Sequence, residues 1–226
     1  MIDKLQGIRA AIIDLDGTLI DTAHDFRMAI NAMREEFGLA PLPLDVILGF
    51  VGKGSENLVR RVLLNDYSEA ETEAKFAAAL DCYQRHYARI NGLHSALYPN
   101  VTAGLQALKD KGLRLACVTN KPVGFAVPLL EKMGLRDFFD VVYGGDSFAR
   151  KKPDPMPLLQ VCADFDLPPR QVVAIGDSSN DAQAARAAGC PVLLLPYGYN
   201  HGEAVQNVDC DGIVATLMHA AQLIRS

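Results

Sequence analysis

The sequence lacks any apolar stretch that approaches the roughly 20 residues needed to cross a membrane. Its N-terminus also lacks a secretory signal pattern, because Asp3 and Lys4 lead into a short strand-like run rather than a long apolar segment. Lysine and arginine number 22 against 27 aspartates and glutamates, and the net charge of −5 argues against a nucleic-acid surface. We therefore expect neither a membrane nor a nucleic acid among the partners of this protein.

Cysteine is scarce and widely spaced. The five cysteines are odd in number and form no C-x-x-C pair, which predicts free or buried thiols in a reducing cytoplasm. The five histidines show no metal-ligand spacing, and we expect most of them at the surface. The sequence also has no internal repeat and no low-complexity tract.

Half of the residues are apolar, and many of them fall in short runs that are typical of buried parallel strands. These runs are Ala10–Ile13, Leu113–Val118, Val141–Tyr143, Val172–Ile175 and Val192–Leu195. Periodic helical stretches separate most of them, which predicts an α/β fold with a Rossmann-like parallel sheet flanked by helices. Ligands of such sheets bind beyond the carboxyl ends of the strands, so the polar residues that follow each run are the candidate site.

A long helical segment interrupts this alternation. Between Asp21 and about Leu97 the pattern predicts helices and no strand, with Thr22 as the cap of the first helix, Asp25 as its capping-box relative and Ser55 as the cap of a later helix. The predicted domains are a discontinuous core of residues 1–20 and 95–226 and a helical cap of residues 21–94. The two connections, near residues 19–22 and 91–99, are candidate hinges.

Two carboxylates, Asp14 and Asp16, directly follow the first predicted strand. A charge at such a buried position must be paired, bound to a metal or neutralised. The turn at Gly17 and Thr18 supplies backbone N–H groups that could face an anion. The segment therefore predicts an acidic nucleophile, a metal and a bound anion.

Further polar residues follow the other predicted strands. Thr119 and Asn120 suit a phosphate, and the alternative is that they serve only as a helix cap. Lys152, whose backbone is stiffened by Pro153, suits a phosphate oxygen, and the alternative is that it belongs to a solvated basic triplet. Asp177 and Asp181 suit a hard divalent cation, or only the dipole of the helix that they open. Taken together, these groups are the parts of a phosphoryl-transfer site.

The chain resembles the haloacid dehalogenase-like hydrolase superfamily, and within it the phosphatases, through four segments in order. They are D-L-D-G-T-L (14–19), V-T-N (118–120), K-K-P-D-P (151–155) and G-D-S-S-N-D (176–181). The resemblance implies a Rossmann-like core with a helical cap. Dehalogenases resemble this family but lack the second aspartate, so Asp16 favours phosphoryl chemistry, in which the leaving group needs a proton.

The resemblance also implies roles for individual residues. Asp14 would form an aspartyl-phosphate, and Asp16 would act as general acid and then base. Mg²⁺ would bind Asp14, the backbone carbonyl of Asp16 and Asp177, with Asp181 in support from a second shell or through water. Gly17, Thr119, Asn120 and Lys152 would bind the phosphoryl group, and Lys151 is a weaker candidate than Lys152.

Two segments resemble phosphoglycolate phosphatases in particular: residues 49–55, with a V-G-x-G loop, and residues 196–202. They favour 2-phosphoglycolate as the small phosphorylated substrate, with Lys53 or the N–H groups of residues 52–55 meeting its carboxylate. The alternative for this loop is a helix-entry turn with a solvated lysine. For the whole protein, the alternatives are a phosphatase acting on a sugar phosphate or pyrophosphate, and a phospho-acceptor receiver or binding module. We expect a monomer or a homodimer.

Overall fold

The computed structural model describes residues 5–200 and 202–225, so Asp3, Lys4 and His201 lie outside the described residues. A six-stranded sheet runs through the centre of one part of the molecule, with the strand order β5-β4-β1-β6-β7-β8 and parallel pairing throughout. The strands are β1 (Ala10–Ile13), β4 (Arg114–Val118), β5 (Val141–Tyr143), β6 (Val172–Gly176), β7 (Val192–Leu194) and β8 (Gly212–Ile213). All five predicted strands are present in this sheet, and its two-residue strand β8 was not predicted.

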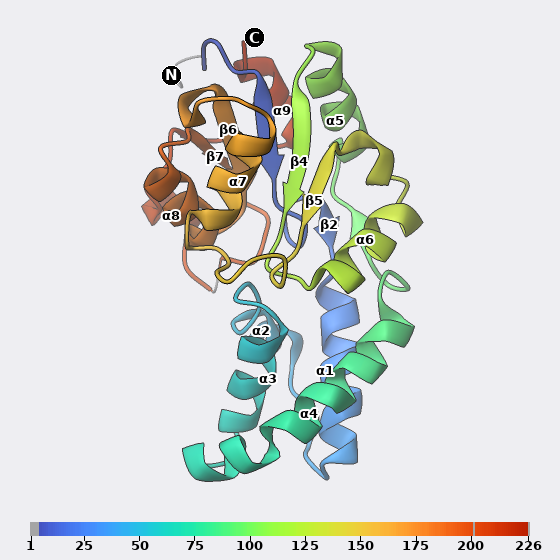
Figure 1. The fold of residues 1–226 in the computed structure, drawn as a ribbon. Coiled ribbons are helices and arrows are strands. Elements are labelled where there is room, and N and C mark those ends of the chain that lie inside the picture. The colour runs from blue at the N-terminus through green and yellow to red at the C-terminus, as the bar shows by residue number, and fades with distance from the viewer. Residues whose placement is uncertain (1–4, 201, 226) are drawn as a thin grey trace.

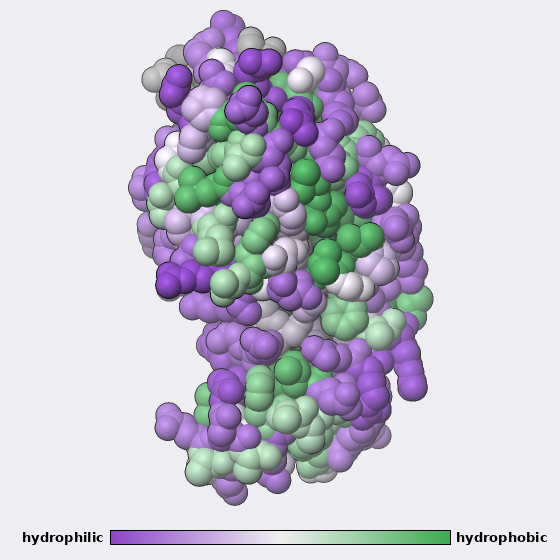
Figure 2. Space-filling view, viewed as in Figure 1, coloured by the Kyte–Doolittle hydropathy of each residue, from purple (hydrophilic) through white to green (hydrophobic). Residues whose placement is uncertain are grey.

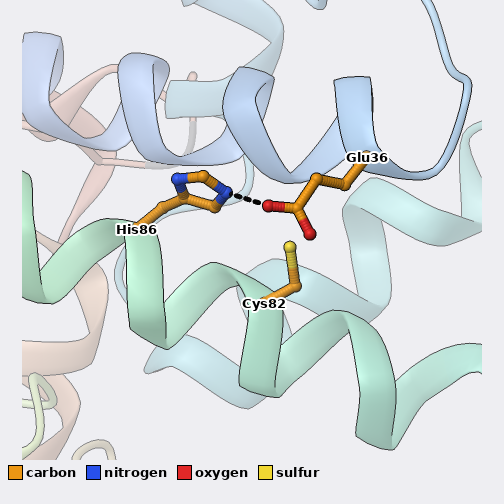
Figure 3. Close-up of side chains that lie close together, drawn as sticks. All are labelled: Glu36, Cys82 and His86. Carbon is orange, nitrogen blue, oxygen red and sulfur yellow. Dashed lines mark hydrogen bonds and ion pairs between the residues drawn. The ribbon is translucent and has the colours of Figure 1, made fainter.

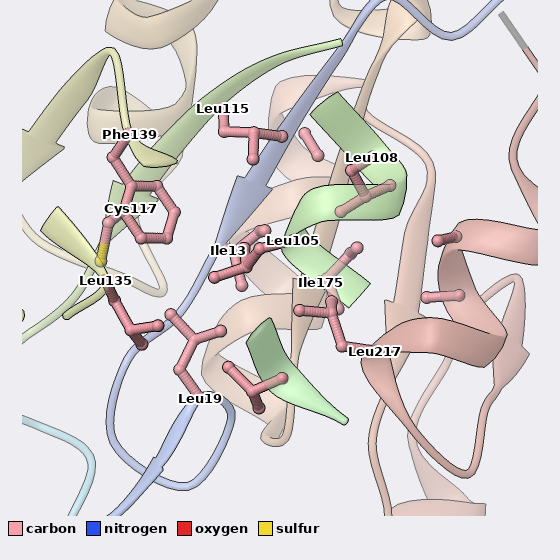
Figure 4. Close-up of a cluster of buried hydrophobic side chains, with 14 of the residues drawn as sticks. Ile13, Leu19, Leu105, Leu108, Leu115, Cys117, Leu135, Phe139, Ile175 and Leu217 are labelled. Carbon is pink, nitrogen blue, oxygen red and sulfur yellow. The ribbon is translucent and has the colours of Figure 1, made fainter. Parts of the chain in front are cut away.

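Helices cover both faces of this sheet (Figure 1). One face packs against α5 (Val101–Asp110), α6 (Val123–Lys132) and α9 (Leu217–Leu223), and the other against α7 (Met156–Asp164) and α8 (Ser179–Ala188). Figure 4 shows the first of these clusters, in which Ile13 and Ile175 from the strands meet Leu105 and Leu217 from the helices. The predicted fold class is confirmed, and burial on both faces explains why the strands read as continuous apolar runs.

The chain order places a crevice between β1 and β6. The connection that leaves β1 leads to helices on the first face, while β6 leads directly into α8 on the second face. Ligands of doubly wound sheets bind where the connections from two neighbouring strands go to opposite faces of the sheet. Asp14 directly follows β1, and Asp177 directly follows β6. Both residues therefore lie at the position expected for a ligand site.

The helices between β1 and α5 form a region with its own apolar cluster. They are α1 (Ala23–Glu36), α2 (Leu44–Leu48), α3 (Ser55–Leu64) and α4 (Glu69–Ile90), and Figure 1 shows them beyond the carboxyl edge of the sheet. We call this region the cap. The surface drawn in Figure 2 is largely hydrophilic, and its outline narrows where the cap meets the sheet. The division of the chain at residues 20 and 95 stays a prediction.

A short antiparallel ribbon joins the cap to the sheet. It consists of β2 (Ile20–Asp21) and β3 (Ala96–Leu97), so the prediction that no strand occurs between Asp21 and Leu97 is wrong at both ends. The sequence pattern missed the ribbon because two-residue strands carry no detectable alternation.

Thr22 occupies the predicted N-cap position of α1, but the predicted capping bonds are absent, and Ser55 is not a cap residue. Thr22 makes no side-chain cap bond, and its hydroxyl donates to Asp16 Oδ1 at 2.8 Å. Asp25 is fully buried and accepts bonds from Gly92 N (2.6 Å), His94 N (2.9 Å) and Ser95 Oγ (2.5 Å). Ser55 is the first residue of α3, and the cap position belongs to Gly54, with no side-chain cap bond. Asp25 thus fastens the second connection to the start of the first cap helix.

Within residues 5–200 and 202–225, no helix is long and apolar enough to cross a membrane.

Candidate active site

A cavity of about 50 Å³ lies where the cap faces the carboxyl ends of β1, β4 and β6. The sheet side contributes charged and polar groups, and the cap side contributes mainly apolar and aromatic ones. From the sheet side come Asp14, Asp16, Thr119, Asn120, Lys121, Lys152, Asp177 and Asp181; from the cap come Phe26, Val51, Leu58, Tyr83 and Tyr87. The structure therefore brings nearly all of the predicted core residues to one place.

Three acids converge beside this cavity. Carboxylate oxygens of Asp14, Asp177 and Asp181 lie within 4.8 Å of one another. Burial raises the pKa of Asp14 to about 7, against the opposing charge of Lys152 and with a further increase from Asp181. Burial and the two neighbouring carboxylates raise the pKa of Asp177 well above its usual range. An all-oxygen set whose members repel one another fits a hard divalent cation such as Mg²⁺.

The surrounding loops hold Asp177 in place. Its Oδ1 accepts a bond from Thr18 Oγ1 at 2.7 Å, and its Oδ2 accepts one from Tyr199 N at 2.6 Å. Two glycines make this approach possible, because a Cβ added at Gly17 or Gly198 would lie 2.5 or 2.1 Å from Asp177 Oδ2. Gly17 also has φ +84°, which favours glycine.

Lys152 is the single lysine that contacts this acid cluster among the described residues. Its buried Nζ lies 2.9 Å from Asp14 Oδ1 and 2.7 Å from Asp181 Oδ1, and it donates to the carbonyl of Val118 at 2.7 Å. Burial lowers the pKa of Lys152, but the two carboxylates outweigh it, and the pKa lies above its usual value. Lys152 is therefore a fixed positive charge beside Asp14.

Asp181 differs from the other two acids, because both of its oxygens already have protein partners. Oδ1 meets Lys152, and Oδ2 accepts bonds from Ser178 N (3.1 Å) and Ser178 Oγ (2.7 Å) in a capping box at the start of α8. This arrangement suits a residue that orients the lysine and supports a cation from a distance.

The phosphate contacts predicted for Gly17 and Asn120 stay predictions, because their donors have protein partners in this arrangement. The N–H groups of Gly17 and Thr18 donate to the carbonyls of Ile20 (2.9 Å) and Leu15 (3.3 Å). The Asn120 amide donates to the carbonyls of Gly52 (2.9 Å) and Lys152 (2.8 Å). The N–H groups of the turn at Gly17 and Thr18 and the side-chain amide of Asn120 thus have protein acceptors in this arrangement.

Thr119 lies on the wall of the cavity, and its predicted contact with the phosphoryl group stays a prediction. Its buried hydroxyl lines the cavity and accepts a bond from Lys121 N at 3.2 Å. A hydroxyl that accepts one bond can still donate another, so Thr119 can bind a phosphoryl oxygen.

Lys53, the predicted carboxylate ligand, is exposed and lines a separate open pocket beside Lys151 and Glu56. Its neighbours Gly52, Gly54 and Ser55 line the main cavity instead. Of the two options in the sequence, the geometry favours the loop backbone over the lysine side chain. Lys151 also points away from the acids, with Nζ 3.9 Å from Glu56 Oε2.

Two site residues had no predicted role. Lys121 is almost fully buried, and its Nζ lies 2.7 and 2.9 Å from the two oxygens of Asp16. The same Nζ stands 4.7 Å from the ring centre of Phe26 and 4.9 Å from that of Tyr87. Tyr199, in the segment 196–202, packs among the cap residues, and its hydroxyl accepts a bond from Thr22 N at 2.8 Å. The only sequence signal for these two residues is their place: Lys121 directly follows the segment 118–120, and Tyr199 lies within the segment 196–202.

Comparison with known proteins gives consistent results. The model of the family described as haloacid dehalogenase-like hydrolase matches residues 8–189. A phosphoglycolate phosphatase of Nitrosospira multiformis is 49% identical over 218 residues, and one of Thiobacillus denitrificans is 46% identical over 217 residues, each alignment covering 96% of both chains. The crystal structure of a predicted phosphoglycolate phosphatase from Haemophilus somnus superposes with a TM-score of 0.92 at 32% identity, covering 97% of this chain and 99% of that one.

Proposed function

The chain belongs to the haloacid dehalogenase-like hydrolase family and is a phosphoric monoester hydrolase, and we propose that it converts 2-phosphoglycolate to glycolate and phosphate with the help of Mg²⁺. The family resemblance drawn from the four sequence segments is confirmed. One observation carries the proposed chemistry: Asp14 stands in a buried cluster with two further acids and a fixed lysine, beside a cavity that Asp16 also lines.

The proposed reaction has two steps. An oxygen of Asp14 attacks phosphorus, the bond from phosphorus to the glycolate oxygen breaks, and Asp16 gives that oxygen a proton. Asp16 then takes a proton from water, whose oxygen attacks phosphorus and frees Asp14 as phosphate leaves. Lys152 and Thr119 hold the phosphoryl oxygens during both steps.

Asp14, the Asp16 carbonyl and Asp177 would hold Mg²⁺, with Asp181 in support. When bound, the ion offsets the negative charge of the carboxylates and the phosphoryl oxygens. Burial and the repulsion between neighbouring carboxylates raise the pKa values of Asp14 and Asp177, which supports this assignment.

Lys121 is the cation best placed for the carboxylate of the substrate. In the present arrangement its Nζ pairs with the Asp16 carboxylate at 2.7 Å. A substrate carboxylate would compete with Asp16 for this lysine, so its binding would release Asp16 from the ion pair.

The size of the cavity supports a small substrate. A volume of about 50 Å³ accommodates about four water-sized centres at roughly 10–15 Å³ each. Such a space favours a substrate with few atoms beyond its phosphate, because a sugar phosphate would need the cap to open further than a smaller substrate would.

Phosphate release from a matched substrate series tests the proposal. The purified protein with Mg²⁺ is expected to show a much higher kcat/KM for 2-phosphoglycolate than for ethyl phosphate, which lacks the carboxylate, or for a hexose phosphate. A chelator should stop the reaction, and added Mg²⁺ should restore it. If ethyl phosphate were the equal of 2-phosphoglycolate, the substrate assignment would fail while the phosphatase chemistry stood. Turnover unaffected by chelation would overturn the metal assignment.

We also propose a cytoplasmic location, because the five cysteines form no disulfide and four of them are buried. A monomeric or homodimeric state remains a prediction, which light scattering of the purified protein can check.

A further inference from the structure

A second group of metal-ligating side chains lies on the cap and shares no residue with the cavity. Glu36 is the last residue of α1, and Cys82 and His86 stand one helical turn apart on α4. Figure 3 shows the three side chains pointing toward one another across the two helices. One ligand atom from each lies within 4.8 Å of the others, and His86 Nε2 is 2.6 Å from Glu36 Oε1.

These three groups offer sulfur, nitrogen and oxygen. Zinc prefers this mixture, and its bonds of about 2.3 Å to sulfur and about 2.0 Å to nitrogen place neighbouring ligand atoms about 3.5 Å apart. Side-chain adjustments within the observed spacing can close the group around one ion, because α1 and α4 already pack against each other in the cap cluster. Three protein ligands leave a fourth position for water.

The burial of the three residues is graded. Cys82 is 2% exposed, the His86 side chain is 21% exposed and the Glu36 side chain is 46% exposed. The carboxylate thus faces solvent, where an ion can arrive, while the sulfur lies in the packed interface of the two helices. The gradient gives the group an open side and a protected side.

We propose that Glu36, Cys82 and His86 bind a soft divalent transition-metal ion such as Zn²⁺, which links α1 to α4. On binding, the S–H bond of Cys82 breaks, a bond from sulfur to the metal forms, and the proton passes to solvent. His86 contributes the lone pair of its neutral ring, and no group changes its oxidation state. The site differs in chemistry from the acid cluster of Asp14, Asp177 and Asp181, whose all-oxygen set suits Mg²⁺.

Arg85 competes with a metal ion for the carboxylate of Glu36. Its Nη2 lies 3.3 Å from Glu36 Oε2, and its Nε lies 3.2 Å from Asp81 Oδ2. The guanidinium offsets the charge of Glu36 when no ion is bound, so an entering cation must overcome its repulsion. Removing this arginine is therefore expected to strengthen zinc binding.

The position of the site suggests what its occupation does. Cys82 and His86 each precede an aromatic residue, Tyr83 and Tyr87, and these two rings line the catalytic cavity beside Phe26 of α1. An ion that ties α1 to α4 stabilises the pair of helices that carries this wall. Zinc should accordingly raise the melting temperature of the protein in excess Mg²⁺.

Calorimetric titration of the Mg²⁺-saturated protein with Zn²⁺ tests the proposal. We expect one zinc ion per chain, and an affinity reduced at least about tenfold in Cys82→Ser and in His86→Ala. The matched control is Cys210→Ser, since Cys210 is the half-buried thiol elsewhere in the described chain and should not matter. Arg85→Ala should bind zinc more tightly than the wild type. Equal binding by Cys82→Ser and the wild type would overturn the site.

A second measurement needs no variant that might misfold. Co²⁺ titrated into the wild-type protein in excess Mg²⁺ should produce a sulfur-to-cobalt charge-transfer band, and Zn²⁺ should remove it. Stoichiometric cobalt binding without that band would show that Cys82 is not a ligand and would overturn the proposal. Retention of the band in Asp177→Asn would separate this site from the magnesium site, and its loss there would contradict the separation.

Discussion

The two sides of the cavity differ in composition and in how they are held. On the sheet side, Asp14, Asp177 and Lys152 are ionisable and little exposed, and each contacts at least one partner at hydrogen-bond or ion-pair distance. On the cap side, Phe26 and Tyr87 stack at 5.5 Å and present ring surfaces. The ionisable groups that must keep fixed distances lie in the segments that follow the paired strands, and the surface that excludes water lies on helices.

The connection between the two sides supports this division of labour. The cap joins the sheet through the narrow ribbon of β2 and β3, and its loop is tied to the sheet side through the carbonyl of Gly52. That carbonyl accepts bonds from Asn120 Nδ2 (2.9 Å) and Asn180 Nδ2 (3.1 Å). A cap held by a ribbon and a few loop contacts can open for substrate while the acid cluster keeps its geometry.

The sharpest test of the sheet side is Asp14→Asn. The amide cannot attack phosphorus, so we expect kcat to fall by about 10⁴-fold or more while the protein still folds. Phosphate release and circular dichroism are the measurements. Wild-type turnover by a folded Asp14→Asn variant would show that another group is the nucleophile.

Replacing Lys152 with methionine should have the next largest effect. The change keeps much of the side-chain volume but leaves Asp14 and Asp181 without their cation, at a cost to metal-free stability of about 3–5 kcal/mol. Loss of a phosphoryl contact should also lower kcat by about 10²–10³-fold. Urea unfolding and steady-state kinetics measure the two effects. Lys151→Met is the matched control. The Lys151 side chain is one-third exposed, so this substitution should change stability and kcat very little.

Lys121→Gln tests the boundary between the two sides. If Lys121 binds the substrate carboxylate, kcat/KM for 2-phosphoglycolate should fall by about 10–100-fold, the value of a hydrogen bond to a charged group. Ethyl phosphate, which has no carboxylate, should be affected far less. Equal losses for both substrates would mean that Lys121 acts through Asp16 alone.

The acid cluster should also make metal-free stability depend on pH. The pKa of Asp14 rises from 3.8 to about 7 on folding, so the folded state binds its proton more tightly than the unfolded state. The stabilisation from this proton is complete below about pH 4 and is lost as pH rises through about 7. Relative to Asp14→Asn, the metal-free wild type should therefore lose unfolding free energy across this window. Mg²⁺ should reduce the difference, and a pH-independent difference would contradict the coupling.

The smallest effect is expected on the cap side, for Lys53→Ala. Its side chain is exposed outside the cavity, so kcat/KM for 2-phosphoglycolate should change by less than about twofold and stability by less than about 0.5 kcal/mol. A much larger loss of kcat/KM would mean that the loop rearranges to bring this lysine to the substrate, as the sequence first suggested.

The sequence by itself determined the features whose signals are local. The five strands were predictable because each is a short apolar run, and all but the edge strand β5 are largely buried. Asp14, Thr119 and Asp177 were found because each follows such a run, and Lys152 because it lies in a recognisable segment. Parallel strands bring their carboxyl ends to one edge, so order along the chain was enough to predict that these residues meet.

Only the tertiary structure decided how donors and acceptors are shared among residues far apart in the chain. The N–H of Gly17 serves its own turn, the amide of Asn120 serves the cap loop, and Lys121 turns inward to Asp16. Glu36 lies 50 residues before His86, so no spacing rule could have placed them together with Cys82. A backbone or side-chain group bonds to whichever partner the packed fold brings within about 3 Å. A buried polar group that is left without a partner costs free energy, so these pairings are fixed by the packing.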